Sequence, residues 1–393
     1  MYPDLSYLFH DLFGTDPDNW FSLINTFGFF LVLAFLASAY VLRKELIRKE
    51  KEGLLTASEE KIISGKGAST SDLIVNAIGG FLLGFKVPYI FQNLAAFKDD
   101  PAAVVLSKDG NFILGIIGAI VLVAWKYWDE NRGKLATPKV ETIKVLPSER
   151  IADITMVAAI SGIIGAKLFA FFESKETFEA LINDPIGQIF SGSGLAIYGG
   201  LIVAFVVVYY YVNKKGIIPI HVMDAVAPAL IMGYAVGRMG CQFSGDGDWG
   251  IPNANPSPDW WFLPDWMWSY GYPRNVSNEG IRMEDCPWEH CSEMIPGVYP
   301  TPIYEVIMSL IIFSILWSLR KRLKIPGMLF FIYMILNGVE RYWIEKIRVN
   351  YKLPWADITQ AELIAILLMI GGLIGIVIVW MRGRSEVKRS GDL

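Results

Sequence analysis

The chain has 393 residues, of which 53% are hydrophobic and 19% are charged, and its formal net charge is −4. Its mean hydropathy of +0.39 and its several long apolar runs are typical of an all-α polytopic membrane protein and exclude an ordinary water-soluble domain. The small negative charge gives no reason to expect a nucleic-acid partner.

Apolar runs predict about nine transmembrane helices within a single integral membrane domain, 1–393. Their expected ranges are 21–43, 72–93, 111–128, 151–172, 194–212, 222–240, 303–319, 326–345 and 361–381. The first twenty residues are acidic and aromatic and lack the basic region of a signal peptide. We therefore expect the first span to be a retained helix.

The basic residues are distributed unevenly between the two sets of loops. Alternate loops hold 23 of the 35 Lys and Arg residues, whereas the opposite set, which includes the N-terminus, holds 8. By the positive-inside rule the N-terminus is expected to be periplasmic and the C-terminus cytoplasmic.

The first span is predicted to open at Trp20 and Phe21. Its other end runs into a basic stretch, 43–49, that we expect to be helical. This stretch would lie near anionic headgroups or form a solvated flank of the span.

The second and fourth predicted spans resemble each other. Gly84 and Lys86 in one recur at the same spacing as Gly165 and Lys167 in the other. The glycines would allow close helix packing, and the lysines would extend toward the interface. An internal duplication is one hypothesis, and 72–128 is predicted to be an extra two-helix insertion.

Small residues surround a tyrosine at the start of the fifth span, in Tyr198-Gly199-Gly200. They leave room for a ligand or for a neighbouring helix, and packing is the favoured interpretation. Asp224, just inside the sixth span, is predicted to cap that helix.

The segment 241–302 is predicted to be a folded cap at the membrane interface, because it holds six of the thirteen tryptophans. Within it, Cys286 and Cys291 could form a disulfide. Free thiols, or a metal site with His290, are the alternatives, although two thiols and one histidine fall short of a closed tetrahedral set.

The stretch 237–250 contains five glycines, two acids and one arginine. Arg238 arrives before the apolar run has ended, and a charge there is costly enough to suggest a functional partner. Gly245 and Gly250 would let backbone and ligand approach closely. With Asp246 nearby, the stretch predicts an anion-binding site at the membrane surface.

Further charges are predicted to reach the same external face. Glu305 opens the seventh span, and Arg341 and Glu345 are spaced to pair on the eighth, with Arg348 on roughly the same face. Guanidinium groups bind phosphate in a bidentate manner, so convergence of arginines predicts a pocket for an anionic lipid headgroup. A nearby acid or tyrosine could accept a proton from a nucleophile.

The order of these features resembles the prolipoprotein diacylglyceryl transferase family, over the first span and about 151–350. The stretch 237–250 corresponds to the family signature, and 299–305 and 341–348 are similar to two further blocks. Shorter matches lie at 165–167 and 198–201.

The resemblance implies transfer of diacylglyceryl from phosphatidylglycerol to the lipobox cysteine thiol of preprolipoproteins. It implies a bacterial inner-membrane enzyme with its active site toward the outer leaflet, membrane lipid and the prolipoprotein signal peptide as partners, and neither cofactor nor metal. Arg238 and Arg341 would clamp the phosphate, and Asp246 and Glu305 are candidate bases or orienting groups. Tyr198 would be the remaining catalytic candidate, and the other expected substrate-binding residues are Gly199, Gly200, Gly245, Gly250, Glu345 and Arg348.

The chain departs from the family pattern at several of these positions. Tyr198 stands where the family has a histidine, Phe21 where it has a tyrosine, and Asp246 where it has a glutamate. Cys241 and Ser244 replace asparagines. A divergent member is therefore expected, and a related transferase with another acceptor, or a non-catalytic phospholipid-binding or transport protein, are the alternatives.

Overall fold

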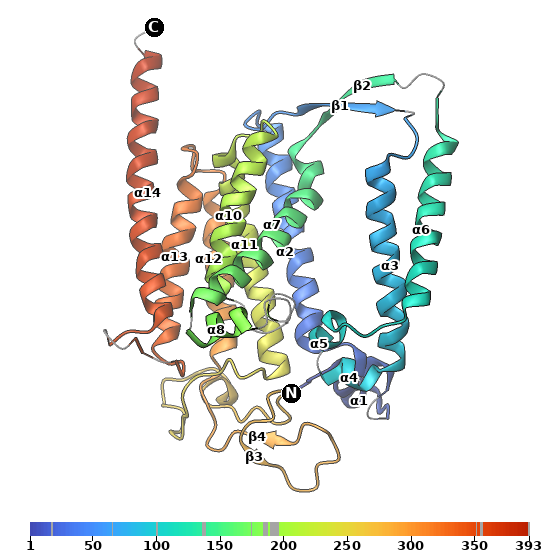
Figure 1. Ribbon diagram of the computed structural model, residues 1–393. Helices are drawn as coiled ribbons and strands as arrows, with labels where there is room; N and C mark the ends of the chain where they lie inside the picture. Colours follow the sequence, from blue (N-terminus) through green and yellow to red (C-terminus); the bar gives the residue numbers. More distant parts are fainter. Residues whose placement is uncertain are drawn as a thin grey trace. The chain divides into compact units, whose positions relative to one another are not determined.

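A computed structural model describes residues 1–16, 19–64, 66–99, 101–135, 139–173, 175–183, 188, 196–350, 352–353 and 357–391. The chain divides into two compact units, of which unit 1 comprises Met1–Leu55 and Ile218–Leu393, and unit 2 comprises Thr56–Ile217. Both units are built mainly of long helices (Figure 1), and this confirms the predicted all-α membrane class.

Unit 1 holds five long helices and the cap. The long helices are α2 (Thr26–Lys51), α11 (Pro219–Ser244), α12 (Thr301–Leu319), α13 (Met328–Glu345) and α14 (Gln360–Gly391). The shorter elements are α1 (Leu5–Phe13), η1 (Trp20–Leu23), η3 (Asp265–Met267), β3 (Ile281–Arg282) and β4 (Ser292–Glu293).

Unit 2 contains two helix pairs and one antiparallel strand pair. Its helices are α3 (Thr70–Gln92), α4 (Leu94–Asp99), α5 (Pro101–Leu106), α6 (Phe112–Arg132), α7 (Ile151–Glu173), α8 (Lys175–Asn183) and α10 (Ile197–Lys214), with the turn η2 (Pro147–Arg150). The strands β1 (Ser58–Ser64) and β2 (Lys139–Val145) pair with Ser58 opposite Val145.

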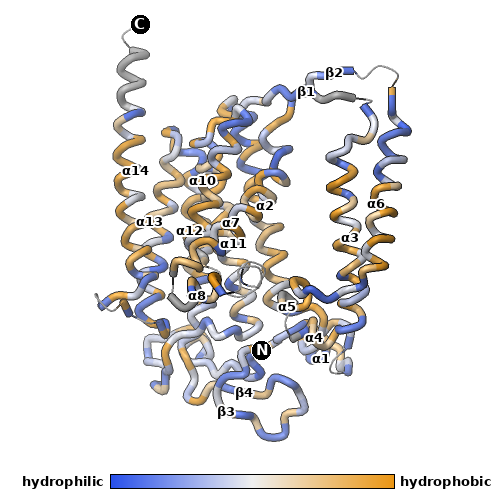
Figure 2. Tube along the Cα trace, viewed as in Figure 1, coloured by the Kyte–Doolittle hydropathy of each residue, from blue (hydrophilic) through white to orange (hydrophobic). Residues whose placement is uncertain are grey.

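Each of the nine predicted spans overlaps a helix, although the start of the fifth, 194–195, lies outside the described residues. Seven helices of the described chain are long and apolar enough to cross a membrane, and the apolar stretch of α10 is shorter. The remaining helix, α13, carries three charged residues in its 18. Figure 2 shows apolar residues along the middles of the long helices. The count of nine spans stays a prediction.

The predicted start of the first span is wrong. Residues Trp20–Leu23 form a separate 3₁₀ turn, and α2 begins at Thr26. The side chain of Asn25 accepts hydrogen bonds from the amides of Phe27 and Gly28, so it caps α2 and fixes where the helix starts.

In unit 1, α11 lies at the centre and packs against α2, α12 and α13, while α14 covers α13. A buried apolar cluster of Ile231, Ile312, Leu316 and Leu329 joins α11, α12 and α13. These contacts fix the relative heights of the three helices, and they therefore determine which charged residues meet at each end of the bundle.

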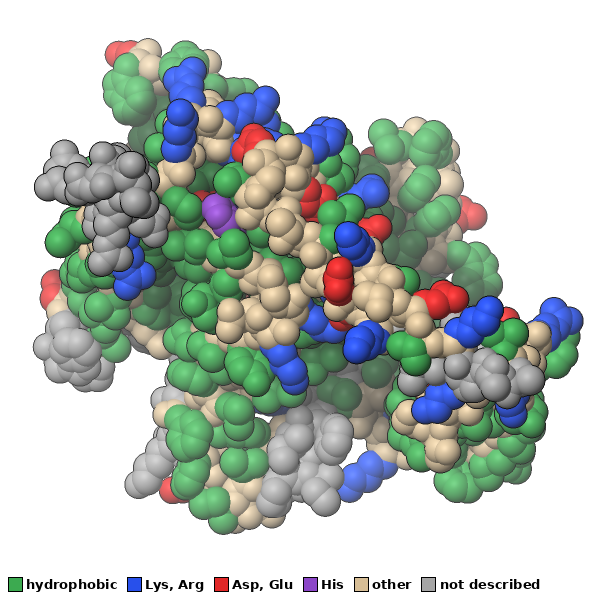
Figure 3. Space-filling model, turned by 90° about the horizontal axis from the view of Figure 1, so that it is seen from above, with side chains coloured by type: hydrophobic (Ala, Val, Ile, Leu, Met, Phe, Trp, Pro, Cys, Tyr) green, Lys and Arg blue, Asp and Glu red, His purple; other side chains and the backbone are tan. Residues whose placement is uncertain are grey.

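An ionic cluster joins the end of α2, the start of α11 and the end of α12. We call it the second ionic cluster, to distinguish it from the charged residues at the opposite end of unit 1. It consists of Glu45, Arg48, Lys49, Asp224 and Arg320. Glu45 is only 1% exposed and pairs with both arginines, at 2.9 Å and 2.7 Å. The basic stretch is helical, as predicted, but Lys49 is buried against α11 and is no solvated flank. At this end of the molecule Lys and Arg side chains are frequent on the surface (Figure 3).

The prediction that Asp224 caps its own helix is wrong. The residue before the first turn of α11 is Ile218, and Asp224 lies further along the helix. Its carboxylate accepts hydrogen bonds from the amides of Gly327, at 2.8 Å, and Phe330, at 3.1 Å. Asp224 therefore caps the neighbouring helix α13, because the loop before α13 brings those free amides against α11.

The cap packs at the other end of unit 1, together with the N-terminal residues. The amide of Tyr2 donates to the carbonyl of Phe243, and Arg274 pairs with Asp11 at 3.0 Å. These contacts agree with the predicted location of the N-terminus and the cap on one side of the membrane. Cys286 and Cys291 form a disulfide, which confirms the first of the three alternatives given for these cysteines.

Within unit 2 the two helix pairs use glycine at similar positions. A Cβ at Gly84 would overlap the backbone of α6 at Leu114, and one at Gly165 would overlap Val203 of α10. Lys86 and Lys167 both donate to backbone carbonyls that follow their helices. The shared pattern agrees with an internal duplication, which stays a hypothesis, as does the insertion at 72–128.

Candidate active site

The charged residues of interest come from three helix ends of unit 1. Arg238 lies in the last two turns of α11, and Asp248 lies in the loop that follows. Glu305 directly follows the first turn of α12, and Arg348 follows the end of α13. Since Arg238 and Asp224 share α11, the two ionic clusters are separated by about 21 Å along that helix.

Four of these side chains form a closed ring of alternating charge, which we call the arginine–carboxylate ring. Arg238 binds Glu305 through Nε at 2.7 Å and Asp248 through Nη1. Arg348 binds Glu305 through Nη1 at 3.5 Å and Asp248 through Nη2. Glu305 is fully buried and also accepts a hydrogen bond from Tyr234. Each carboxylate therefore joins two guanidiniums.

The loop after α11 holds the ring closed. Gly250 bridges Arg348 as an isolated antiparallel pair, and the amide of Ile251 donates to the carbonyl of Ile347 at 2.8 Å. A Cβ at Gly250 would lie 2.5 Å from that same carbonyl. The hydroxyl of Thr301 donates to the carbonyl of Asp248 at 2.7 Å. Glycine is thus required at 250 so that the loop can reach Arg348.

Arg341 and Glu345 pair on one face of α13 at 3.1 Å, as their spacing predicts. Glu345 is 3% exposed, and it accepts further hydrogen bonds from Asn350 at 2.6 Å and Thr359 at 2.8 Å. Glu345 therefore joins α13 to the segment that leads into α14. The ring contains Arg348 as the partner of Arg238, whereas Arg341 binds this neighbouring acid.

The two acids of the loop are in different environments. Burial and the nearby charge of Asp248 raise the pKa of Asp246. Burial also acts to raise the pKa of Asp248, but Arg238 and Arg348 outweigh it, so that pKa lies below its ordinary value. Asp246 was the acid singled out from the sequence, and the ion pairs of the ring are made by Asp248.

Other predicted site residues serve the packing around the ring or belong to unit 2. Gly245 ends α11 with a φ of 65°, a conformation that favours glycine. Tyr198, Gly199 and Gly200 open α10 in unit 2. A Cβ on either of these glycines would overlap α7, which agrees with the favoured packing interpretation. Their contact with substrate stays a prediction.

Tyr234, Asp248 and Glu340 were not among the site residues predicted from the sequence. Tyr234 precedes Arg238 by one helical turn and lies on the same face, so the spacing could have found it. Asp248 was visible as the second acid of the glycine-rich stretch. Glu340 is next to Arg341, and it is only 3% exposed.

A metal is not needed to hold this loop. Cys241, Asp246 and Asp248 place one ligand atom each within 4.8 Å of one another. Both oxygens of Asp248, however, already bind guanidiniums. The positive charge that a cation would supply is therefore present in the two arginines.

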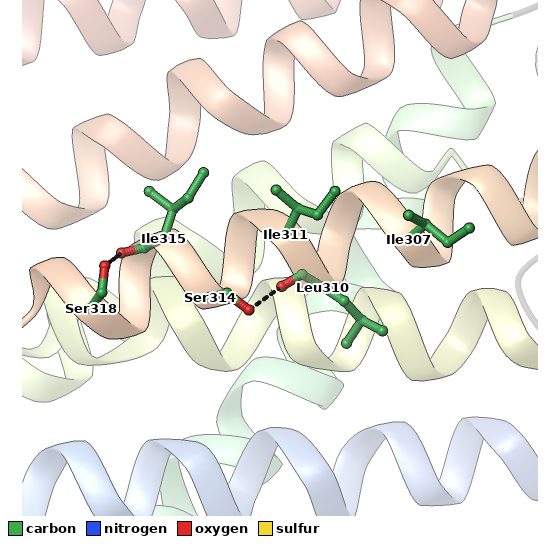
Figure 4. Close-up of a pocket in the computed structure, with 6 residues that line it drawn as sticks. All are labelled: Ile307, Leu310, Ile311, Ser314, Ile315 and Ser318. Carbon is green, nitrogen blue, oxygen red and sulfur yellow. Dashed lines mark hydrogen bonds between the residues drawn. The ribbon is translucent and has the colours of Figure 1, made fainter.

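A shallow hollow of about 530 Å³ runs along one face of α12 (Figure 4). Four of its six lining residues are apolar, namely Ile307, Leu310, Ile311 and Ile315. The hydroxyls of its two serines donate to carbonyls of their own helix. With no charged residue in its lining, this hollow is an apolar face of a spanning helix, and the chemistry resides in the ring.

The fold and the site together define a polytopic membrane protein with a partly buried arginine–carboxylate ring at the end of three packed helices. Comparison with known proteins identifies the family. The pattern of the prolipoprotein diacylglyceryl transferase family matches residues 111–378, which include the whole ring. The chain belongs to this family.

Similar proteins occur in distant bacteria, and each is named phosphatidylglycerol–prolipoprotein diacylglyceryl transferase. One from Lysinibacillus sphaericus is 28% identical over 243 residues, covering 62% of this chain and 81% of the relative. One from Bifidobacterium adolescentis is 27% identical over 284 residues, covering 70% and 76%. One from Prochlorococcus marinus is 27% identical over 281 residues, covering 65% and 87%.

Proposed function

We propose that this protein transfers the diacylglyceryl group of phosphatidylglycerol to the thiol of a lipobox cysteine in a preprolipoprotein. The single observation that carries the proposal is the ring of two arginines and two carboxylates, which lies within the segment that matches the family. The reaction would take place at the outer leaflet of the bacterial inner membrane, the side on which the predicted topology puts the cap.

The ring suits the binding of a phosphodiester. Nη2 of Arg238 and Nε of Arg348 form no hydrogen bond with any residue that the structure describes, so both guanidiniums keep a donor for a ligand oxygen. Asp248 and Glu305 hold the arginines in place before the lipid arrives. Preorganised donors stabilise the charge that develops on a leaving phosphate without reorganisation.

The reaction is a displacement at carbon. The thiol sulfur attacks the glyceryl carbon that bears the phosphate, a carbon–sulfur bond forms, and the carbon–oxygen bond breaks. The electron pair of the broken carbon–oxygen bond stays on the phosphate oxygen, and glycerol phosphate leaves. We assign Arg238, with Arg348 and Arg341, to binding the phosphate, and Asp248 and Glu305 to positioning the guanidiniums.

Complementation of a strain depleted of its own transferase tests the function, with Arg238→Ala as the control. Growth and mature lipoprotein are expected from the wild-type chain and not from the variant. The purified protein should also convert labelled phosphatidylglycerol and a lipobox peptide into a thioether, detected by mass spectrometry. Label released from the lipid without a thioether product would instead indicate another acceptor, and lipid that stays bound without turnover would indicate a binding protein.

A further inference from the structure

Glu340 is a buried acid near the ring that takes part in none of the ring's ion pairs. It lies on α13, it is 3% exposed, and neither of its oxygens accepts a hydrogen bond from any residue that the structure describes. A buried carboxylate without hydrogen bonds is costly, and native structures seldom keep one without a reason.

The surroundings of Glu340 place it beside the ring. It lies within electrostatic reach of Glu305, Arg238 and Arg341, and of the buried Tyr333. The hydroxyl of Tyr234 lies close enough to act on Glu340 as well, and it donates its hydrogen bond to Glu305. The packing of α13 against α11 and α12 creates this position.

The other acids at this site are already engaged. Glu305 and Asp248 each bind two guanidiniums, which makes them weak proton acceptors. Asp246 accepts the amide of Asp248 at 3.3 Å, in the loop beyond the end of α11. The three histidines lie elsewhere: His10 packs edge-to-face against Trp288, His221 is near the start of α11 and close to Lys49, and His290 is in the disulfide loop of the cap.

We propose that Glu340 is the catalytic base that accepts the proton of the attacking thiol. This inference rests on the proposed function and adds a residue to it. As the carbon–sulfur bond forms and the carbon–oxygen bond breaks, the thiol proton passes to a Glu340 oxygen. It then passes to the departing glycerol phosphate, so the carboxylate is restored for the next turnover. The absent hydrogen bonds leave its lone pairs available for that proton.

The test compares two acceptor peptides of identical sequence, one with cysteine and one with selenocysteine at the acceptor position. A selenol is already ionised in neutral water and needs no base. With the cysteine peptide, Glu340→Gln is expected to lower kcat by about 10²-fold or more, with little change in KM, and Glu340→Asp is expected to restore part of it. With the selenocysteine peptide, most of the loss should disappear.

Thermal unfolding gives a second, independent measurement. Because Glu340 accepts no hydrogen bond that could be lost, Glu340→Gln should leave the Tm unchanged or raise it. Glu345→Gln loses its charge and with it the ion pair with Arg341, so it should lower the Tm. Glu362→Gln is the activity control, since this buried acid caps α14 and pairs with Lys346.

The outcomes separate this inference from the function itself. An inactive wild-type protein would overturn the proposed function. An active wild-type with an equally active Glu340→Gln, or an equal loss with both peptides, would overturn only the role of Glu340. Rescue by selenocysteine in Asp246→Asn, and not in Glu340→Gln, would assign the base to Asp246 instead.

Discussion

Arg238 and Arg348 bind the same two carboxylates from opposite sides, although one lies near the end of α11 and the other follows α13. Each arginine thus stabilises the position of the other through Asp248 and Glu305. The separation of like charges in the ring is maintained by the acids between them. A phosphate that enters the ring meets two guanidiniums whose orientation is already fixed.

Replacement of Arg238 should therefore affect both the clamp and the ring. Arg238→Ala is expected to lower the rate of thioether formation by about 10²-fold or more, because a donor to the leaving phosphate is lost. Arg238→Lys should recover only part of the activity, since an ammonium keeps the charge but lacks the planar fork. Arg274→Ala, which removes an ion pair with Asp11 in the cap, is the matched control and should remain active.

Asp248 and Asp246 should respond to substitution with opposite effects on stability. Asp248 has a pKa below its ordinary value, so its contribution is complete above the unfolded-state pKa and is lost as pH falls through the folded value. Asp246 has a raised pKa, so it lowers stability as pH rises through that range. At pH 7, Asp248→Asn should cost about 1–3 kcal/mol, because its side chain is partly solvated, and Asp246→Asn should be neutral or stabilising.

Unfolding curves of both variants, recorded at pH 7 and at several values from pH 4 downward, measure this difference. Because the folded-state pKa of Asp248 is lowered, the cost of Asp248→Asn should stay near its full value at pH 4 and shrink only below it. Equal destabilisation by the two substitutions would mean that the loop acids share the ring, contrary to the structure.

Gly250 gives a prediction about the loop that positions Arg348. Gly250→Ala would bring a methyl group against the carbonyl of Ile347, and the loop would have to move away. Activity should fall at least about tenfold while the helices remain folded, since a displaced catalytic group is costly even at small distances. Gly28→Ala is the control, because a Cβ at that helical glycine meets no atom within 4 Å. A fully active Gly250→Ala would show that the loop does not determine the position of Arg348.

The sequence was sufficient to predict the helices and most of the charged residues of the site. The apolar runs and the i, i+4 spacing of Arg341 and Glu345 depend on local geometry, which periodicity records. The pairing of Arg238 with Arg348 through shared acids depends on the tertiary packing of α11, α12 and α13, which no local pattern specifies. The choice between Asp246 and Asp248 depends on where the loop turns at Gly245 and Gly247, and both glycines have positive φ.

The same distinction explains two outcomes at the other end of unit 1. Asp224 has the chemistry of a helix cap, and the sequence indicated that correctly, but its partner helix is α13. The solvated flank was one of two alternatives for the basic stretch at the end of α2, and it does not hold for Lys49 because that side chain meets Asp224 of α11 in the folded bundle. In both cases residues distant in the chain decide what a local pattern means.

The second ionic cluster is expected to contribute to stability without taking part in catalysis. Glu45→Gln would leave Arg48 and Arg320 without their shared buried carboxylate, which should cost about 3–5 kcal/mol. Thermal unfolding in detergent measures the loss, and thioether formation at a permissive temperature should remain near the wild-type rate, because the ring is about 21 Å away along α11. Glu52→Gln is the matched control, since Glu52 pairs with Arg48 on the exposed side of the helix and should contribute little. If Glu45→Gln instead abolished turnover at full stability, the two ends of the bundle would be coupled, and the cluster would belong to the catalytic machinery.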